Sequence, residues 1–387
     1  MSGRELLLLV AQLRFKDGMD NQKIAAELVK SRILKQSSRT ALKVGELVDE
    51  AGQWLLEKQA RLAAIEIEKG IESKLAGDLV RKFQGKMFVG LIDAVVVEGG
   101  EEKSPAEYEA LLKRYGAAAA NQFDRLAGIE QYDDEPLHVS VGGGQTILDM
   151  VSALPDRKRT NVYYYAAGLI GRGNTKLSSH VGPEANATVA WARSGRLPKH
   201  LYYGTISPYE FDEAALAGMN RKERHEYAKQ TIKKQIGEFT DQISTGDALQ
   251  TMTKDINMAI ADLGIVHPSE RDAFYGMRHV EKLWVTGLLR PLGIDSELLQ
   301  QEGAIGEISY NCFDKRGEGN PRWNFFLTAG AGSDHEGVTF YRNLVKAHRY
   351  VMVIAGAGKE VAVRAAIEAK LFNALVTDVA TAKKLLA

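Results

Sequence analysis

The pattern of apolar and polar positions is helical over the first 60 residues and alternates between strands and helices from about residue 91. Near the C-terminus, an apolar run over 351–354 precedes a glycine-containing turn over 355–358. A helical pattern over 359–370 and a second apolar run over 374–376 follow. A strand, a turn, a helix and a strand in this order predict a βαβ unit and therefore a parallel sheet.

Similar alternation extends upstream of this unit. Apolar runs predict strands over 95–97, 137–141, 162–166 and 259–265. Helical patterns separate them, over 105–126, 147–153 and near 187–192, the first opened by Ser104-Pro105 and Glu107. Residues 308–310 and 325–327 are expected to belong to a hairpin. Such alternation over about 300 residues predicts a doubly wound α/β domain.

The first 60 residues predict three short helices, the outline of a helix-turn-helix. An apolar stripe marks the first helix, and Asp20 or Asn21 is placed to cap a second over 22–28. The third follows Ser37-Ser38. Its connection after Leu28 is longer than the usual turn of the motif, and Gly45 interrupts the helical pattern.

Charge is balanced over the whole chain but not along it. The formal net charge is zero, which argues against a protein that coats nucleic acid. Between residues 30 and 43 the charged residues are all basic, and this cluster provides candidate contacts to the phosphate backbone of DNA: Arg32, Lys35, Arg39 and Lys43. A helix face exposed to solvent would carry the same charges.

Length and composition limit the remaining possibilities. A chain of 387 residues fits two or three domains. We expect a DNA-binding domain over 1–60, a linker helix over 61–87 and a ligand-binding domain over 88–387. The single cysteine, Cys312, excludes an internal disulfide, and no residues have metal-ligand spacing, so no metal or cofactor is expected. No long apolar segment is present, so we expect no membrane contact and a cytoplasmic location.

Polar and glycine-rich segments follow several predicted strands, where ligands bind in sheets of this kind. The candidate ligand-binding residues are Gly142, Gly143, Gly144, Gln145, Thr146, Asn186, Asp262 and Lys359. A second glycine loop over 168–174 contains Arg172, and Ser178, Ser179 and His180 follow it. Backbone amides, hydroxyls, a carboxylate and a lysine would suit a phosphorylated polyol. Glycine turns also serve strand-to-helix geometry alone, and Asp262 would equally suit a turn cap.

A set of short motifs in the last ninety residues adds a family resemblance. The motifs are Gly303-Ala304-Ile305-Gly306-Glu307, Cys312-Phe313-Asp314, the segment 351–359 and the segment 373–378, with weaker matches at 139–146, from Gly168, at 186–188 and at 262–265. With these motifs the sequence resembles the SorC family of bacterial sugar-responsive transcriptional regulators. The matches together extend over most of residues 88–387.

The resemblance implies a helix-turn-helix and an effector domain with a sugar-isomerase-like α/β fold. It also implies a sugar or sugar-phosphate effector, a homodimer or homotetramer, and a regulator rather than an enzyme. The effector site would include 142–146, Asn186, Asp262 and Lys359, with Glu307 standing where the family commonly has aspartate. Ala357 replaces a common glycine, and the family's serine-arginine recognition helix is matched only in part, by Ser31-Arg32 or Ser38-Arg39.

Two other functions remain open from the sequence. The first is a sugar-phosphate isomerase or deaminase with the same fold, for which Asp262 or Glu307 would be the general base. The second is a SorC-like sensor that no longer binds DNA and acts through protein partners.

Overall fold

A computed structural model gives the fold of the chain. The described residues are 10, 13–14, 19–30, 43–50, 71–84, 90–102, 104–130, 136–156, 159, 161–167, 182–195, 213–220, 222–224, 226–227, 230–231, 234, 256–265, 296–309, 311–320, 337–356 and 358–387. None of the described helices is long and apolar enough to cross a membrane.

The chain divides into two compact units, Met1–Ser73 with Gly85–Phe88, and Lys74–Gln84 with Val89–Ala387. In the first unit, helix α2 (Asn21–Lys30) buries Ile24 and Leu28. Residues 43–50 are also helical, and a small core joins the described segments of this unit: Val10, Leu13, Ile24, Ala25, Leu28, Val44 and Val48. The Asp20 carboxylate accepts a hydrogen bond from the Lys23 amide at 2.8 Å, which confirms the predicted cap.

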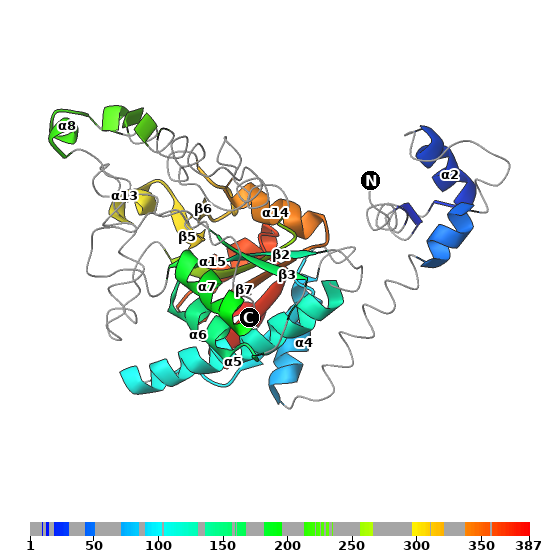
Figure 1. Ribbon diagram of the computed structural model, residues 1–387, viewed down its shortest axis with the longest axis horizontal. Coiled ribbons are helices and arrows are strands. Elements are labelled where there is room, and N and C mark those ends of the chain that lie inside the picture. Colours follow the sequence, from blue (N-terminus) through cyan, green and yellow to red (C-terminus); the bar gives the residue numbers. More distant parts are fainter. Residues whose placement is uncertain are drawn as a thin grey trace. The chain divides into compact units, whose positions relative to one another are not determined.

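A parallel sheet forms the centre of the second unit (Figure 1). Its strand order is β1-β8-β7-β4-β2-β3, and every pair along this path is parallel. The strands are β1 (Asp93–Val97), β2 (Leu137–Val141), β3 (Val162–Ala166), β4 (Met258–Ile265), β7 (Tyr350–Ile354) and β8 (Ala374–Asp378). Each lies where the apolar pattern predicts a strand. Most side chains of β4, β7 and β8 are buried, as expected of parallel strands covered on both faces.

Helices cover both faces of this sheet. Helix α5 (Pro105–Glu130) contacts β1, β7 and β8, α6 (Gln145–Ala153) contacts β4, and α7 (Pro183–Arg193) contacts β2 and β3 (Figure 1). On the other face lie α14 (Val338–Lys346), α15 (Glu360–Glu368) and α16 (Val379–Leu386). Two short helices belong to neither of these layers: α8 (Glu213–Ala217), and α13 (Ser296–Gln301), which contacts β5. The predicted α/β class is therefore observed.

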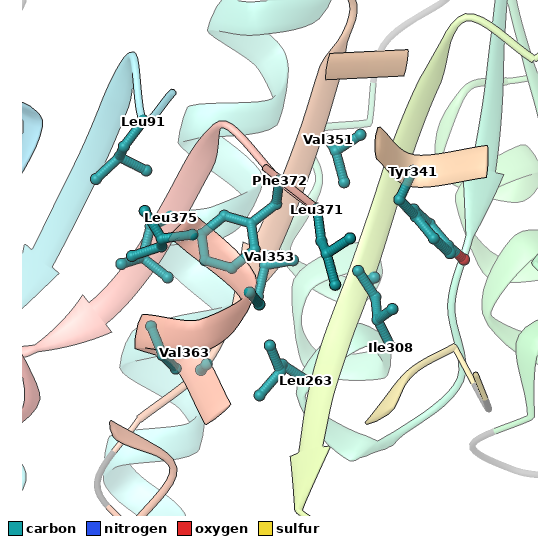
Figure 2. Close-up of a cluster of buried hydrophobic side chains, with 14 of the residues drawn as sticks. Leu91, Leu263, Ile308, Tyr341, Val351, Val353, Val363, Leu371, Phe372 and Leu375 are labelled. Carbon is teal, nitrogen blue, oxygen red and sulfur yellow. The ribbon is translucent and has the colours of Figure 1, made fainter. Parts of the chain in front are cut away.

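Alternation along the strands shows which residues face each layer. Leu263, Val351, Val353 and Leu375 join one apolar cluster with Val363 of α15, and Figure 2 shows them around Phe372. Helix α4 (Ile71–Phe83), in the region predicted as a linker, contributes Ala76 and Leu79 to the same cluster. Because side chains alternate along a strand, Asp262 points to the opposite face, the one covered by α5, α6 and α7.

An antiparallel hairpin extends the sheet. Strand β5 (Ala304–Ile308) pairs with β4 and with β6 (Asn311–Asp314). Ser309 lies in the turn rather than in a strand, because the Asn311 side-chain amide donates to the carbonyls of Ile308 and Ser309 and closes the chain there. Ile308 and Ser309 therefore belong to a hairpin, as predicted, and residue 310 and the segment 325–327 lie outside the described residues.

Candidate functional site

The site lies where strand β4 changes the strand with which it pairs on one edge. Strand β4 pairs with β2 up to Ile260 and with β5 from Leu263, so Ala261 and Asp262 lie between the two pairings. The Ser309 Oγ atom lies 3.5 Å from the position that a Cβ on Gly142 would occupy, so β5 continues along the edge of β4 that β2 leaves. Helices after β2 and after β7 also lie on opposite faces of the sheet. Ligands of open α/β sheets bind at this kind of switch point.

Three of the predicted ligand-binding residues lie together beside this stretch of β4 between the two pairings. The Asp262 side chain lies against Gly144, where a Cβ would be 2.9 Å from Oδ2, and Gly144 has a φ of 101° that favours glycine. The other carboxylate oxygen, Oδ1, is 3.4 Å from the Lys359 Nζ. Asp262 therefore connects the loop after β2 to the loop after β7.

Lys359 is held at the N-terminus of α15. Its Nζ donates to the Leu263 carbonyl at 2.6 Å, and its side chain is only 16% exposed. Lys359 is also the N-terminal cap residue of α15 and makes no side-chain cap. The first turn of α15 carries Glu360, whose carboxylate accepts hydrogen bonds from the Gly358 and Glu360 amides, so the Lys359 ammonium is the group of this loop that attracts an anion.

Asn186 fixes the glycine loop from the other side. It lies on α7 with no exposed surface, and its Nδ2 donates to the Gly142 carbonyl at 3.0 Å and to the Gly144 carbonyl at 3.3 Å. Helix α6 begins after Gly144 with no side-chain cap. The loop is therefore held through its carbonyls, which leaves the amides of the first turn of α6 to a ligand or to water.

Burial controls the acid–base character of the site. It raises the pKa of Asp262 above its ordinary value, and the nearby Lys359 ammonium and the Leu263 amide offset only part of the effect. Glu307 lies opposite Gly264 in the β4–β5 pair, and its side chain lies over that glycine. Burial, and then the charge of Glu307, raise the pKa values of Cys312 and Tyr341.

Not every predicted site residue lies with Gly144, Asp262 and Lys359. The Gln145 side chain is exposed and donates to Asp149 at 2.9 Å, along its own helix. Gly143 and Thr146 are half-buried in the same loop and first turn. The loop 168–174 with Arg172, and Ser178, Ser179 and His180, lie outside the described residues. Within the residues that are described, no group of three or more His, Cys, Asp or Glu side chains is placed to hold a metal.

The predicted DNA contacts are described at one position only. Lys43 is exposed at the start of the helical residues 43–50, beside buried Val44. Arg32, Lys35 and Arg39 lie outside the described residues.

A buried network behind the loop after β7 was not predicted from the sequence. The Tyr115 hydroxyl of α5 donates to Asp378 at 2.5 Å, and the Thr381 amide and hydroxyl donate to the same carboxylate at 2.7 and 2.8 Å. Gly356 lies under this group, and a Cβ there would be 2.9 Å from Asp378 and would overlap the Tyr115 hydroxyl. The pair Thr377-Asp378 before a helical pattern signals a cap, but nothing local indicates Tyr115.

Comparisons with known proteins show a matching sequence family and similar folds. A family model described as "Putative sugar-binding domain" matches residues 281–387. The structure of the full-length sorbitol operon regulator SorC from Klebsiella pneumoniae is similar, with a TM-score of 0.52 and 20% identity over 99% of each chain. The resemblance to the SorC family is confirmed.

Two further structures share the fold of the SorC-like domain. A DeoR family transcriptional regulator from Listeria monocytogenes has a TM-score of 0.50 and 18% identity over 81% of this chain and 99% of that one. A transcriptional regulator from Streptococcus pneumoniae TIGR4 has a TM-score of 0.50 and 13% identity, over 81% and 96%. No curated protein matches the chain in sequence. At these identities the structures show the fold, and the function is inferred from the site.

Proposed function

We propose that this chain is a SorC-type transcriptional regulator whose crevice at the end of β4 binds a sugar or sugar-phosphate effector. The observation that carries the proposal is the meeting of Gly144, Asp262 and Lys359 at the switch point of the sheet. The similar structures from Klebsiella pneumoniae and Listeria monocytogenes are those of an operon regulator and a transcriptional regulator, which supports the regulatory role. The match to a sugar-binding domain supports a sugar as the ligand. Binding of operator DNA by the N-terminal unit, and assembly into a homodimer or homotetramer, are parts of the same proposal.

An anionic group would bind at the Lys359 end of the crevice. It would meet the Lys359 ammonium and the uncapped first turn of α6, whose amides and dipole favour negative charge. The phosphate would then compete with Asp262 for Lys359. Because burial already raises the pKa of Asp262, losing that partner would favour uptake of a proton by its carboxyl group, or a hydrogen bond to a sugar hydroxyl.

A cavity elsewhere on the sheet is a poorer place for a phosphate. It has a volume of about 560 Å³ and lies at the ends of β1 and β8. Its lining contains four glutamates, Glu98, Glu101, Glu102 and Glu107, against the two cations Arg114 and Lys383. Like charges so close would raise the cost of binding an anion. The crevice at β4 therefore suits a phosphorylated ligand better.

Thermal unfolding with sugar phosphates tests the effector site. A ligand at one hundred times its dissociation constant stabilises the folded state by about 2.7 kcal/mol. We expect at least one hexose phosphate to raise the Tm, and Lys359→Ala to remove that rise. Lys346→Ala, which changes an exposed lysine at the end of α14, is the matched control and should keep it. An unchanged rise in Lys359→Ala would exclude Lys359 as an effector contact.

Salt-dependent binding to the DNA upstream of its own gene tests the regulatory role. The double variant Arg39→Ala with Lys43→Ala should bind more weakly, and the slope of log K against log salt should fall by about 0.9 for each phosphate that the variant no longer neutralises. A wild-type protein without salt-sensitive binding to this DNA would contradict operator binding. It would favour a sensor that acts through protein partners.

One observation favours a second candidate function. Asp262 lies at the switch point of the sheet with a raised pKa beside Lys359, an arrangement that also suits a general acid–base. Turnover of an aldose or ketose phosphate that Asp262→Asn abolishes would establish a sugar-phosphate isomerase or deaminase. Effector binding without turnover would support the regulator.

A further inference from the structure

Helix α15 carries a carboxylate of its own at its N-terminus, next to Lys359. Glu360 is the first residue of this helix, and its carboxylate turns back to accept hydrogen bonds from the Gly358 and Glu360 amides. The free amides of a helix N-terminus are a place where anions bind. An internal anion therefore occupies donors that a ligand anion beside Lys359 would otherwise reach.

A lysine of the neighbouring helix α16 holds this carboxylate. The Lys384 Nζ lies 2.6 Å from the Glu360 Oε1, and the side chain of Glu360 is only 17% exposed. Burial alone would raise the pKa of Glu360, but the Lys384 ammonium and the two amides together lower it below its ordinary value. Glu360 is therefore ionised at neutral pH.

The end of α16 is itself fixed by two cations, which keeps Lys384 opposite Glu360. Arg364, one turn further along α15, donates to the Lys384 carbonyl at 2.9 Å. Lys82 of α4 donates to the Leu385 carbonyl, also at 2.9 Å. Both cations satisfy carbonyls at the C-terminus of a helix, where positive charge is favoured. The ion pair between α15 and α16 therefore joins two helices whose ends are held together.

Glu360 and a bound phosphate would repel each other as like charges. Glu360 follows Lys359 directly in the chain, and its carboxylate bends toward the loop that carries Lys359. A phosphate at Lys359 would therefore lie near this negative charge, and salt screens partly buried charges less than exposed ones. An unphosphorylated sugar would not be repelled. Lys384 neutralises part of the repulsion, because it pairs with the same carboxylate.

We propose that Glu360 and Lys384 together set the affinity of the effector site for anionic ligands, with Glu360 lowering it and Lys384 restoring it. This inference rests on the proposed effector site and adds a control of ligand charge to it. Because Glu360 fills the N-terminus of α15, a ligand anion is directed to Lys359 and the first turn of α6. The two residues determine specificity through their charges, and neither needs to touch the ligand.

Calorimetric titration of the full chain tests the inference. The probes are glucose 6-phosphate, fructose 6-phosphate, the two unphosphorylated sugars and inorganic phosphate. Glu360→Gln keeps the size of the side chain and removes its charge. It should tighten the binding of all anionic probes by about 5- to 20-fold, as expected when one like charge near a ligand is removed, and leave the unphosphorylated sugars unchanged. Lys384→Met should weaken the anionic probes by about the same factor.

A double-mutant cycle connects the two residues. In Glu360→Gln the charge that Lys384 neutralises is absent, so adding Lys384→Met should change anion affinity less than Lys384→Met does alone. A general effect of net charge would instead give the same factor in both backgrounds, and that result would contradict the inference.

Two matched controls make the same changes of charge on the same helices. Glu368 is exposed at the other end of α15, and Lys383 is the exposed neighbour of Lys384 on α16. Glu368→Gln and Lys383→Met should leave every affinity unchanged. A rise in anion affinity in Glu368→Gln as large as that in Glu360→Gln would overturn the specific role of Glu360.

The possible results separate this inference from the proposed function. Sugar-phosphate binding that Lys359→Ala removes and Glu360→Gln leaves unchanged would overturn the role of Glu360 while the effector site stands. Anion binding by Glu360→Gln alone, with wild type binding only unphosphorylated sugars, would support the inference and contradict a phosphorylated effector. Failure of every probe to bind either protein would overturn both. If thermal unfolding shows that Glu360→Gln is not folded, Lys384→Met decides, and unchanged anion affinity in that variant overturns the inference.

Discussion

At the scale of single residues, Gly356 is where the loop carrying Lys359 packs most closely on its surroundings. A methyl group there would overlap the Tyr115 hydroxyl and approach Asp378 to 2.9 Å. We therefore expect Gly356→Ala to lower the free energy of unfolding by about 1–3 kcal/mol, as overpacking does in other cores. Urea denaturation measures this change. Gly218→Ala is the control, because a Cβ at Gly218 has open space around it, and equal losses in both variants would refute the packing argument.

Asp262 gives a residue-scale prediction about pH. Its pKa is raised by burial, so the folded state binds the proton more tightly than the unfolded chain does. The stabilisation from this group is complete below the unfolded pKa of about 3.9 and is lost as the pH rises through the raised value. Wild-type stability, relative to Asp262→Asn, should therefore fall as the pH rises from about 4. Urea denaturation of both proteins across this range measures the difference, and a constant difference would contradict the raised pKa.

At the scale of elements, the loop after β7 is held by three others: α5 through Tyr115, β8 through Asp378, and α16 through Thr381. Tyr115→Phe should cost about 1.5–3 kcal/mol, because it removes a hydrogen bond to a buried carboxylate. It also removes the hydroxyl that a methyl group at Gly356 would overlap, so Tyr115→Phe with Gly356→Ala should cost less than the two single changes summed. A double-mutant cycle by urea denaturation measures this coupling, and simple additivity would show that the two positions do not share one contact.

The elements also show what the sequence could predict and why. The strands β2, β4, β7 and β8 were predictable because buried parallel strands are short, continuous apolar runs between turns. A hairpin was predicted at residues 308–310, but the position of its turn depends on the Asn311 side chain, which an apolar pattern does not show. Turn chemistry of this kind overrides a short apolar pattern.

The position of the candidate site could be predicted from the sequence, because the topology of the sheet determines where the loops meet. Loops that follow parallel strands must meet at one edge of the sheet, so the convergence of Gly144, Asp262 and Lys359 followed from the strand assignments. Tyr115 and Ser309 were missed because they reach this region from elements distant in the sequence, whose register only the folded chain defines. The Gln145 side chain was predicted to line the site, but it bonds Asp149 instead.

At the scale of the whole molecule, the proposed regulation requires communication between the two compact units of the chain. If the effector binds one conformational state of the protein more tightly, it shifts the population of that state and changes operator affinity. The coupling is reciprocal, so operator DNA should change effector affinity by the same factor. The N-terminal unit contains its own small core, with Ile24, Leu28, Val44 and Val48, which suits a separately folded DNA-binding module.

The most direct test of the central claim is a crystal structure of the protein with its tightest-binding sugar phosphate. The account predicts the phosphate within hydrogen-bonding distance of the Lys359 Nζ and of the first-turn amides of α6, with the sugar beside Asp262 and Gly144. Density for the ligand in the cavity lined by Glu98 and Arg114, with the crevice at Asp262 empty, would contradict it.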